Sequence, residues 1–161
     1  KLFTNNNIEY ELYSNDGIWT NQVQIDETLI RSRLKESSIN IVHFAVHGGA
    51  QGLILKWSNA AYIGHQVPVS FLTSSGIRLI EEFQGKLIVS GACASAQFAD
   101  DFLAAGADAV VAPLTEISWS KLGLFFKIFY LSYRSSKLVK DALNKAVEEF
   151  PQYNCYHVFQ N

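Results

Sequence analysis

The sequence predicts an α/β fold in which helices cover both faces of a mostly parallel sheet, a three-layer α/β/α sandwich. Apolar runs at 87–89 and 109–112 are bounded by glycine or proline, which is typical of buried parallel strands. The segment between them, 94–105, is helix-prone, so the three segments form one right-handed βαβ unit. The 161 residues, 48% of them hydrophobic, suit one domain, 1–161, with a substantial core.

The segments before this unit are assigned from their periodicity and turn residues. Residues 26–37 place apolar side chains on one side of a helix and charged side chains on the other. Residues 39–46 (INIVHFAV) are apolar and β-branched, which indicates a second buried strand. Three further elements are expected: a strand at 8–13, a hairpin flap with arms at 52–57 and 61–66, and a short helix within 69–83.

Within the helix-prone segment, Phe98, Phe102 and Leu103 form an apolar stripe. Asp100 and Asp101 lie off that stripe. The remaining expected elements are a helix at 119–133 with an aromatic face (Phe125, Phe126, Phe129, Tyr130), a helix from Ser136 to Phe150 that turns Leu138, Leu143, Ala146 and Val147 inward, and a short strand at 156–159.

Composition excludes several classes of function. The formal net charge of −2 argues against binding to nucleic acid or a membrane surface through general charge. The two cysteines do not suggest a disulfide scaffold, and they favour a reducing, cytoplasmic location. Neither an apolar run of membrane-spanning length nor a signal peptide is present in the sequence given. The chain lacks methionine and begins at Lys1, so we expect further sequence upstream.

Two predicted strands end in residues that carry chemistry. His47 follows the strand at 39–46, and Cys93 follows the strand at 87–89, near the start of a helix. Because ligands and reacting groups gather at the carboxyl ends of parallel strands, we expect the two side chains to meet. An imidazole activates a thiol as a nucleophile, and the N–H groups of Gly48 and Cys93 suit an oxyanion hole.

Structural interpretations stand beside the catalytic one. A cysteine at a strand end is often a small buried apolar residue, and His-Gly is common in turns. His43 is interpreted as a core histidine with a hydrogen-bond partner. A metal site of His43, His47 and Cys93 fits poorly because it lacks a fourth ligand, so no metal or cofactor is expected. His65, His157 and Cys155 are interpreted as structural.

The segments VHFAVHGG, LIL, KLIVSGACASA and FLAAGADAVVAP resemble the CHAT family. The resemblance extends from about residue 39 to the C-terminal YHVFQN. It implies a caspase-like cysteine peptidase, in the clan of separases, metacaspases and gingipains. It also implies that His47 is the general base or acid and that Cys93 is the nucleophile that forms a thioester. The histidine and cysteine of this clan often lie further apart than a tight ion pair.

The sequence departs from the family in two places. CHAT proteins usually carry Leu-Trp-x-Val-Asp/Asn in the loop where this chain reads LTEISW, at 114–119. Glu116 in that loop either selects a basic P1 residue of the substrate or is a solvated carboxylate at a helix start. The strand that normally precedes the one at 8–13 is also not found. The resemblance implies an activating partner or an upstream sensor domain.

Two main functional hypotheses follow. In the first, the protein is a cysteine endopeptidase that cleaves partner proteins or peptides, a regulated bacterial effector of defence or signalling. In the second, it is a non-catalytic caspase-like module for protein interaction, although both His47 and Cys93 are retained. A flavodoxin-like nucleotide binder is disfavoured because no glycine-rich phosphate-binding loop follows any strand.

Overall fold

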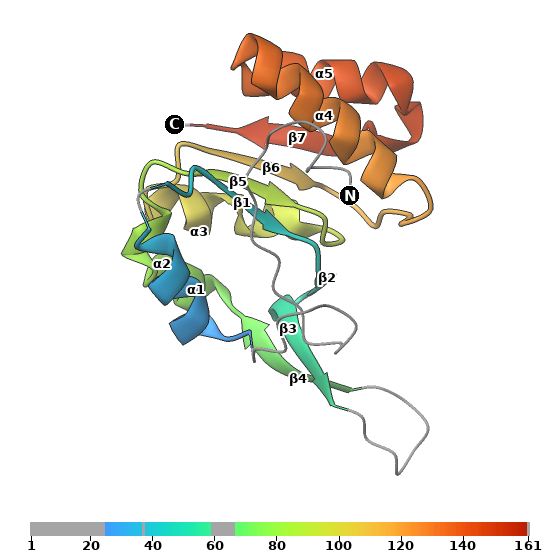
Figure 1. Ribbon diagram of the computed structural model, residues 1–161. Coiled ribbons are helices and arrows are strands. Elements are labelled where there is room, and N and C mark those ends of the chain that lie inside the picture. Colours follow the sequence, from blue (N-terminus) through green and yellow to red (C-terminus); the bar gives the residue numbers. More distant parts are fainter. Residues whose placement is uncertain (1–24, 37, 59–66, 161) are drawn as a thin grey trace.

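The structure of the chain, a computed structural model, describes residues 25–36, 38–58 and 67–160 (Figure 1). The predicted strand at 8–13, the predicted flap arm at 61–66 and His65 lie outside these residues.

The described residues form two sheets, five α-helices and three short 3₁₀ helices. The strands are β1 (Ile41–Phe44), β2 (His47–Gly49), β3 (Gly52–Ser58), β4 (Val67–Leu72), β5 (Leu87–Ser90), β6 (Ala109–Pro113) and β7 (Tyr156–Phe159). The helices are α1 (Glu27–Leu34), α2 (Ser74–Arg78), η2 (Glu81–Phe83), η3 (Ser95–Phe98), α3 (Ala99–Ala104), α4 (Leu122–Ser136), α5 (Val139–Glu149) and η4 (Pro151–Tyr153).

The main sheet has the strand order β1-β5-β6-β7. The first three strands are parallel, and β7 runs antiparallel to β6. Every residue of β5 and β6 is buried, which agrees with their unbroken apolar sequences. The fold is therefore mixed α/β with a mostly parallel four-stranded sheet, as its strand sequences predict.

Side chains of the central strands alternate between two hydrophobic clusters on opposite faces of the sheet. We call them the α3-side and the α4-side clusters. Helices α1, α2 and α3 lie on one side of the sheet in Figure 1, and α4 and α5 lie on the other. The α3-side cluster includes Phe44, Ile77, Phe83, Ile88, Phe102 and Val110. The α4-side cluster includes Leu87, Val89, Val111, Phe125, Phe126, Phe129, Tyr130, Tyr153 and Tyr156.

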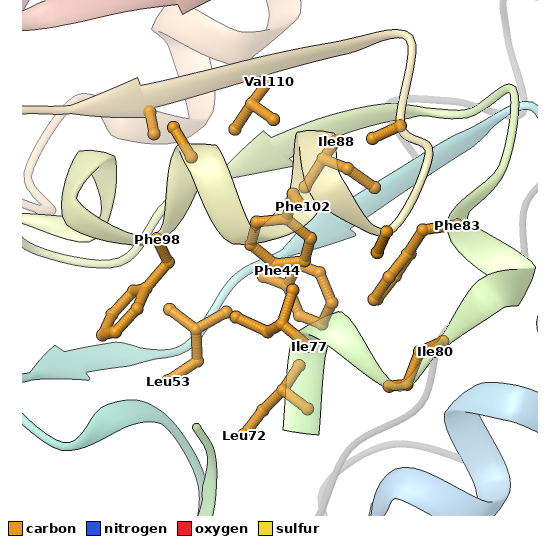
Figure 2. Close-up of a cluster of buried hydrophobic side chains, with 14 of the residues drawn as sticks. Phe44, Leu53, Leu72, Ile77, Ile80, Phe83, Ile88, Phe98, Phe102 and Val110 are labelled. Carbon is orange, nitrogen blue, oxygen red and sulfur yellow. The ribbon is translucent and has the colours of Figure 1, made fainter. Parts of the chain in front are cut away.

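The second sheet, β2-β3-β4, is antiparallel and forms the predicted flap. The arm that pairs with β3 is β4, which begins at Val67, and the short helix predicted within 69–83 is α2. Leu53 of β3 and Leu72 of β4 extend into the α3-side cluster toward Ile77 and Phe98 (Figure 2). These buried side chains attach the base of the flap to the domain.

The inward position predicted for Leu138 is wrong, whereas Asp101 lies off the apolar stripe as predicted but is buried. Asp101 is only 5% exposed, because Ser74 Oγ and Arg78 Nε of the neighbouring α2 each donate a hydrogen bond of 2.5 Å to its carboxylate. Leu138 is 58% exposed, because it is the N-cap residue of α5 and lies before the inward-facing stripe of that helix. None of the helices in the described ranges has the length and apolar character needed to span a membrane.

Candidate functional site

The candidate site lies where parallel strands β1 and β5 end at the same edge of the sheet. The N–H of Gly91, just after β5, donates a 2.8 Å hydrogen bond to the carbonyl oxygen of Phe44, the last residue of β1. Beyond this bond the first chain turns into β2 at His47, and the second reaches Cys93. The pairing of the two strand ends therefore controls how His47 and Cys93 approach each other.

The main chain beside His47 packs directly against Cys93. A Cβ atom at Gly48 would overlap the carbonyl oxygen of Cys93 and would lie 3.1 Å from the nitrogen of Cys93. Only glycine fits at position 48 without moving one of the two backbones. The structure thus brings three of the predicted site residues, His47, Gly48 and Cys93, to one place.

A loop between β6 and α4 contacts both candidate catalytic side chains. The His47 ring is exposed and packs against the ring of Trp119, with centroids 5.4 Å apart and planes tilted by 33°. The half-buried Cys93 sulfur lies 3.9 Å from the carbonyl oxygen of Ile117, and the cysteine is free of disulfide bonds. Residues 114–121 therefore border the site, beside the ends of β1 and β5.

The residue after Cys93 adopts a conformation that the predicted helix would not allow. Ala94 has φ 51° and ψ 23°, in the left-handed region, which is uncommon for a residue with a side chain. Its N–H donates a 2.9 Å hydrogen bond to the carbonyl oxygen of Thr115, which holds the turn in place. Backbone strain of this kind gathers at functional sites, and it occurs here beside the candidate nucleophile.

Tyr153 fixes the far end of the same loop. Its hydroxyl donates to the carbonyl oxygen of Ser118 at 2.8 Å and accepts from the N–H of Lys121 at 3.3 Å. Sequence reasoning singled out the 114–119 loop but gave Ile117, Trp119 and Tyr153 no role, because each acts through contacts with residues far away in the chain.

Glu116 lies in this loop with its side chain exposed, and it forms no ion pair with any residue in the described ranges. Because α4 begins only at Leu122, Glu116 is not a helix-start carboxylate. Its selection of a basic P1 residue stays a prediction.

His43 lies apart from this constellation, on the edge strand β1. The residue as a whole is exposed, yet Nδ1 forms a 2.8 Å hydrogen bond with the hydroxyl of Tyr130 and the ring packs edge-on against Phe126 at 4.4 Å. Burial of the ring's inner side lowers the pKa of His43 to about 4, so the imidazole is neutral at pH 7. The predicted hydrogen-bond partner of His43 is confirmed, but the predicted core position is not, because the residue is exposed on an edge strand.

The other titratable candidates do not join the site. Cys155 packs against the α4-side cluster, and His157 is exposed on β7. Within the described ranges, no group of three or more His, Cys, Asp or Glu side chains is arranged to hold a metal ion.

Comparisons with known proteins add no family assignment. No protein-family model matches the chain, and no curated protein is significantly similar to it. The function is therefore argued from the site.

Proposed function

We propose that the protein is a cysteine endopeptidase that cleaves partner proteins through His47 and Cys93. One observation carries this proposal: Gly48, which follows His47, packs against the main chain of Cys93. An imidazole and a thiol are thereby delivered to the same edge of the sheet by strands distant in sequence. That pairing is the minimal equipment for thiol-based acyl transfer.

The reaction would follow from the chemistry of the two groups. The imidazole of His47 takes the proton from the Cys93 thiol, and the resulting thiolate attacks the carbonyl carbon of the scissile peptide bond. The N–H groups of Gly48 and Cys93 donate to the oxyanion that forms. The intermediate expels the amine, which takes the proton from the imidazolium, and leaves a thioester on Cys93. A water molecule, deprotonated by His47, then hydrolyses the thioester and restores the thiol.

The proposal includes a caspase-like fold of the CHAT type, arranged as a three-layer α/β/α sandwich. The mostly parallel sheet, the helices on both of its faces and the antiparallel flap support it. The resemblance of the His-Gly and Ala-Cys segments to CHAT proteins extends the proposal to a regulated, cytoplasmic bacterial effector. Its activation would come from a partner or an attached sensor domain.

A peptide library incubated with the activated protein tests the proposal. Both Cys93→Ala and His47→Ala should abolish cleavage, while Cys155→Ala should cleave normally because the Cys155 side chain packs against the α4-side cluster and is not a reacting group. The cleavage pattern would also report the P1 preference, including any role of Glu116. Cleavage that persists in Cys93→Ala would overturn the assignment. Partner binding that survives His47→Ala, with no proteolysis by any variant, would favour the interaction module instead.

A further inference from the structure

Tyr156 begins β7 directly opposite the end of β6. It pairs with Pro113 and is only 3% exposed. Its ring is enclosed by Phe125 at 4.9 Å and Phe126 at 5.8 Å between centroids, so its direction is set by packing. The side chain therefore presents its hydroxyl in a constrained position inside the α4-side cluster.

The hydroxyl of Tyr156 is buried and has no hydrogen-bond partner among the described residues. Two other buried tyrosines of the same cluster differ, since Tyr130 bonds to His43 and Tyr153 to Ser118. A buried hydroxyl without a partner destabilises a protein, and phenylalanine would fill the same space without that cost. Packing alone therefore does not explain the hydroxyl at this position.

The loop after β6 connects Tyr156 to the candidate nucleophile. The N–H of Leu114 donates a 2.9 Å hydrogen bond to the carbonyl oxygen of Cys155, and the carbonyl oxygen of Thr115 accepts one from Ala94. Two consecutive loop residues thus join the start of β7 to the residue that follows Cys93.

Ile117 links Cys93 to the cluster that contains Tyr156. Ile117, whose carbonyl oxygen faces the sulfur at 3.9 Å, packs against the cluster that contains Tyr156. Tyr156 itself pairs with Pro113, the last residue of β6, at the edge of the sheet where β1 and β5 also end.

The electrostatics of Tyr156 agree with this placement. Burial raises the pKa of its hydroxyl well above the usual value, and negative charge on Cys155, Tyr153, Cys93 and Tyr130 raises it further. The phenol therefore keeps its proton across the neutral range. A neutral hydroxyl near a sulfur that ionises is a hydrogen-bond donor to the thiolate.

We propose that Tyr156 is a positioning residue for Cys93, whose hydroxyl donates a hydrogen bond to the sulfur once the thiol has ionised. The thiol proton passes to the imidazole of His47, and Tyr156 retains its own proton. The bond would satisfy the buried hydroxyl and would hold the thiolate toward the substrate. This inference rests on the proposed function, in that it takes Cys93 to be the nucleophile.

The test compares Tyr156→Phe with Tyr130→Phe, which removes a different buried hydroxyl from the same cluster. Each protein is treated with iodoacetamide across the neutral pH range, and mass spectrometry of peptides separates the alkylation of Cys93 from that of Cys155. Tyr156→Phe should slow the alkylation of Cys93 by about tenfold at pH 7, the effect of losing one hydrogen bond to a charged acceptor. Its pH profile should move to higher pH, while Tyr130→Phe should react like the unmodified chain.

Equal rates and equal pH profiles for Tyr156→Phe and the unmodified chain would overturn the inference. Equal slowing by Tyr130→Phe would also overturn it, because the effect would then be a general loosening of the cluster. The assay needs no proteolysis, so its outcome is separate from that of the proposed function. A chain whose Cys93 responds as expected but which cleaves no peptide would retain the Tyr156 contact and lose the peptidase assignment.

Discussion

The two faces of the main sheet are equally well buried but chemically different. On the α3 side, the buried members are aliphatic side chains, alanines and phenylalanines, with Phe83 and Phe102 packed edge-on at 5.1 Å (Figure 2). On the α4 side, tyrosines Tyr130, Tyr153 and Tyr156 contribute hydroxyl groups to the cluster. The face that carries these hydroxyls is also the one that supports the loop beside Cys93.

The buried polar groups of the two faces differ in the same way. Asp101, at the rim of the α3 side, accepts hydrogen bonds from both Ser74 and Arg78. Tyr156, on the α4 side, has a buried hydroxyl that no described residue satisfies. The carboxylate of Asp101 on the first face helps to stabilise the fold, whereas the hydroxyl of Tyr156 on the second face has no hydrogen-bond partner among the described residues. The contrast is between a satisfied polar group on one face and an unsatisfied one on the other.

Truncation of one buried phenylalanine on each face should have the largest effect on stability and tests whether the two faces act independently. Phe125→Ala on the α4 side and Phe83→Ala on the α3 side should each lower the free energy of unfolding by about 3–5 kcal/mol, because each leaves a cavity at a fully buried position. Urea denaturation measures this loss. Only Phe125→Ala should also slow the alkylation of Cys93, since its ring supports Tyr153 and Tyr156 at 4.9 Å each. A similar slowing in Phe83→Ala would show that the two faces are not separable.

Removal of one buried polar group from each face should have unequal effects. Asp101→Ala should lower the free energy of unfolding by about 1–3 kcal/mol, because it breaks the hydrogen bonds that join α2 and α3. Tyr156→Phe should leave that free energy unchanged or raise it, because it removes a hydroxyl that is not satisfied. Thermal and urea unfolding of the two variants provide the measurement. A large loss of stability in Tyr156→Phe would show that its hydroxyl has a structural partner.

Loss of the Tyr153 hydroxyl should have a smaller effect that is confined to the site. Tyr153→Phe should lower the free energy of unfolding by about 1 kcal/mol, because its bonds to Ser118 and Lys121 are replaced by bonds to water. Hydrogen exchange of the amide of Lys121 should become faster. Tyr133→Phe, which changes a partly exposed tyrosine on α4, serves as the control. Unchanged exchange at Lys121 would contradict the role assigned to Tyr153.

A further expected effect is the pH dependence of stability contributed by His43. Its pKa is lowered to about 4 in the folded chain, against about 6.5 in an unfolded chain, so the unfolded state binds the proton more readily. Its contribution is fully present above pH 6.5, declines as the pH falls toward 4, and then levels off. The difference in melting temperature between the unmodified chain and His43→Phe should change within that window. His157→Phe, at an exposed position, should change it less.

Much of the fold was readable in the chain because strong local signals agreed with their surroundings. The apolar runs at 87–89 and 109–112 became the buried strands β5 and β6, which end near Gly91 and at Pro113. The helix after β5 was less readable. A left-handed Ala94 and a 3₁₀ turn precede α3, because the chain bends to meet Thr115, which is distant in sequence.

The residues of the candidate site also fall into those that the sequence predicted and those that it did not. His47, Gly48 and Cys93 were readable because each follows a recognisable strand, and parallel strands end at one edge. Trp119 against His47 and Ile117 beside Cys93 were not readable, because a loop carries no periodicity that tells where it folds back. The burial of Asp101 was not readable for a related reason: helical spacing alone does not show that α2 covers its polar side.

Local pattern thus specified the strands of the main sheet, the approximate helices and the residues at the strand ends, since burial of apolar side chains acts on every such segment wherever it lies. The packing of Gly48 on Cys93, the satisfied Asp101 and the unsatisfied Tyr156 arose only when separate elements came together. Hydrogen bonds and close contacts between distant segments depend on relative positions to within a fraction of an ångström, and no run of adjacent residues encodes those positions.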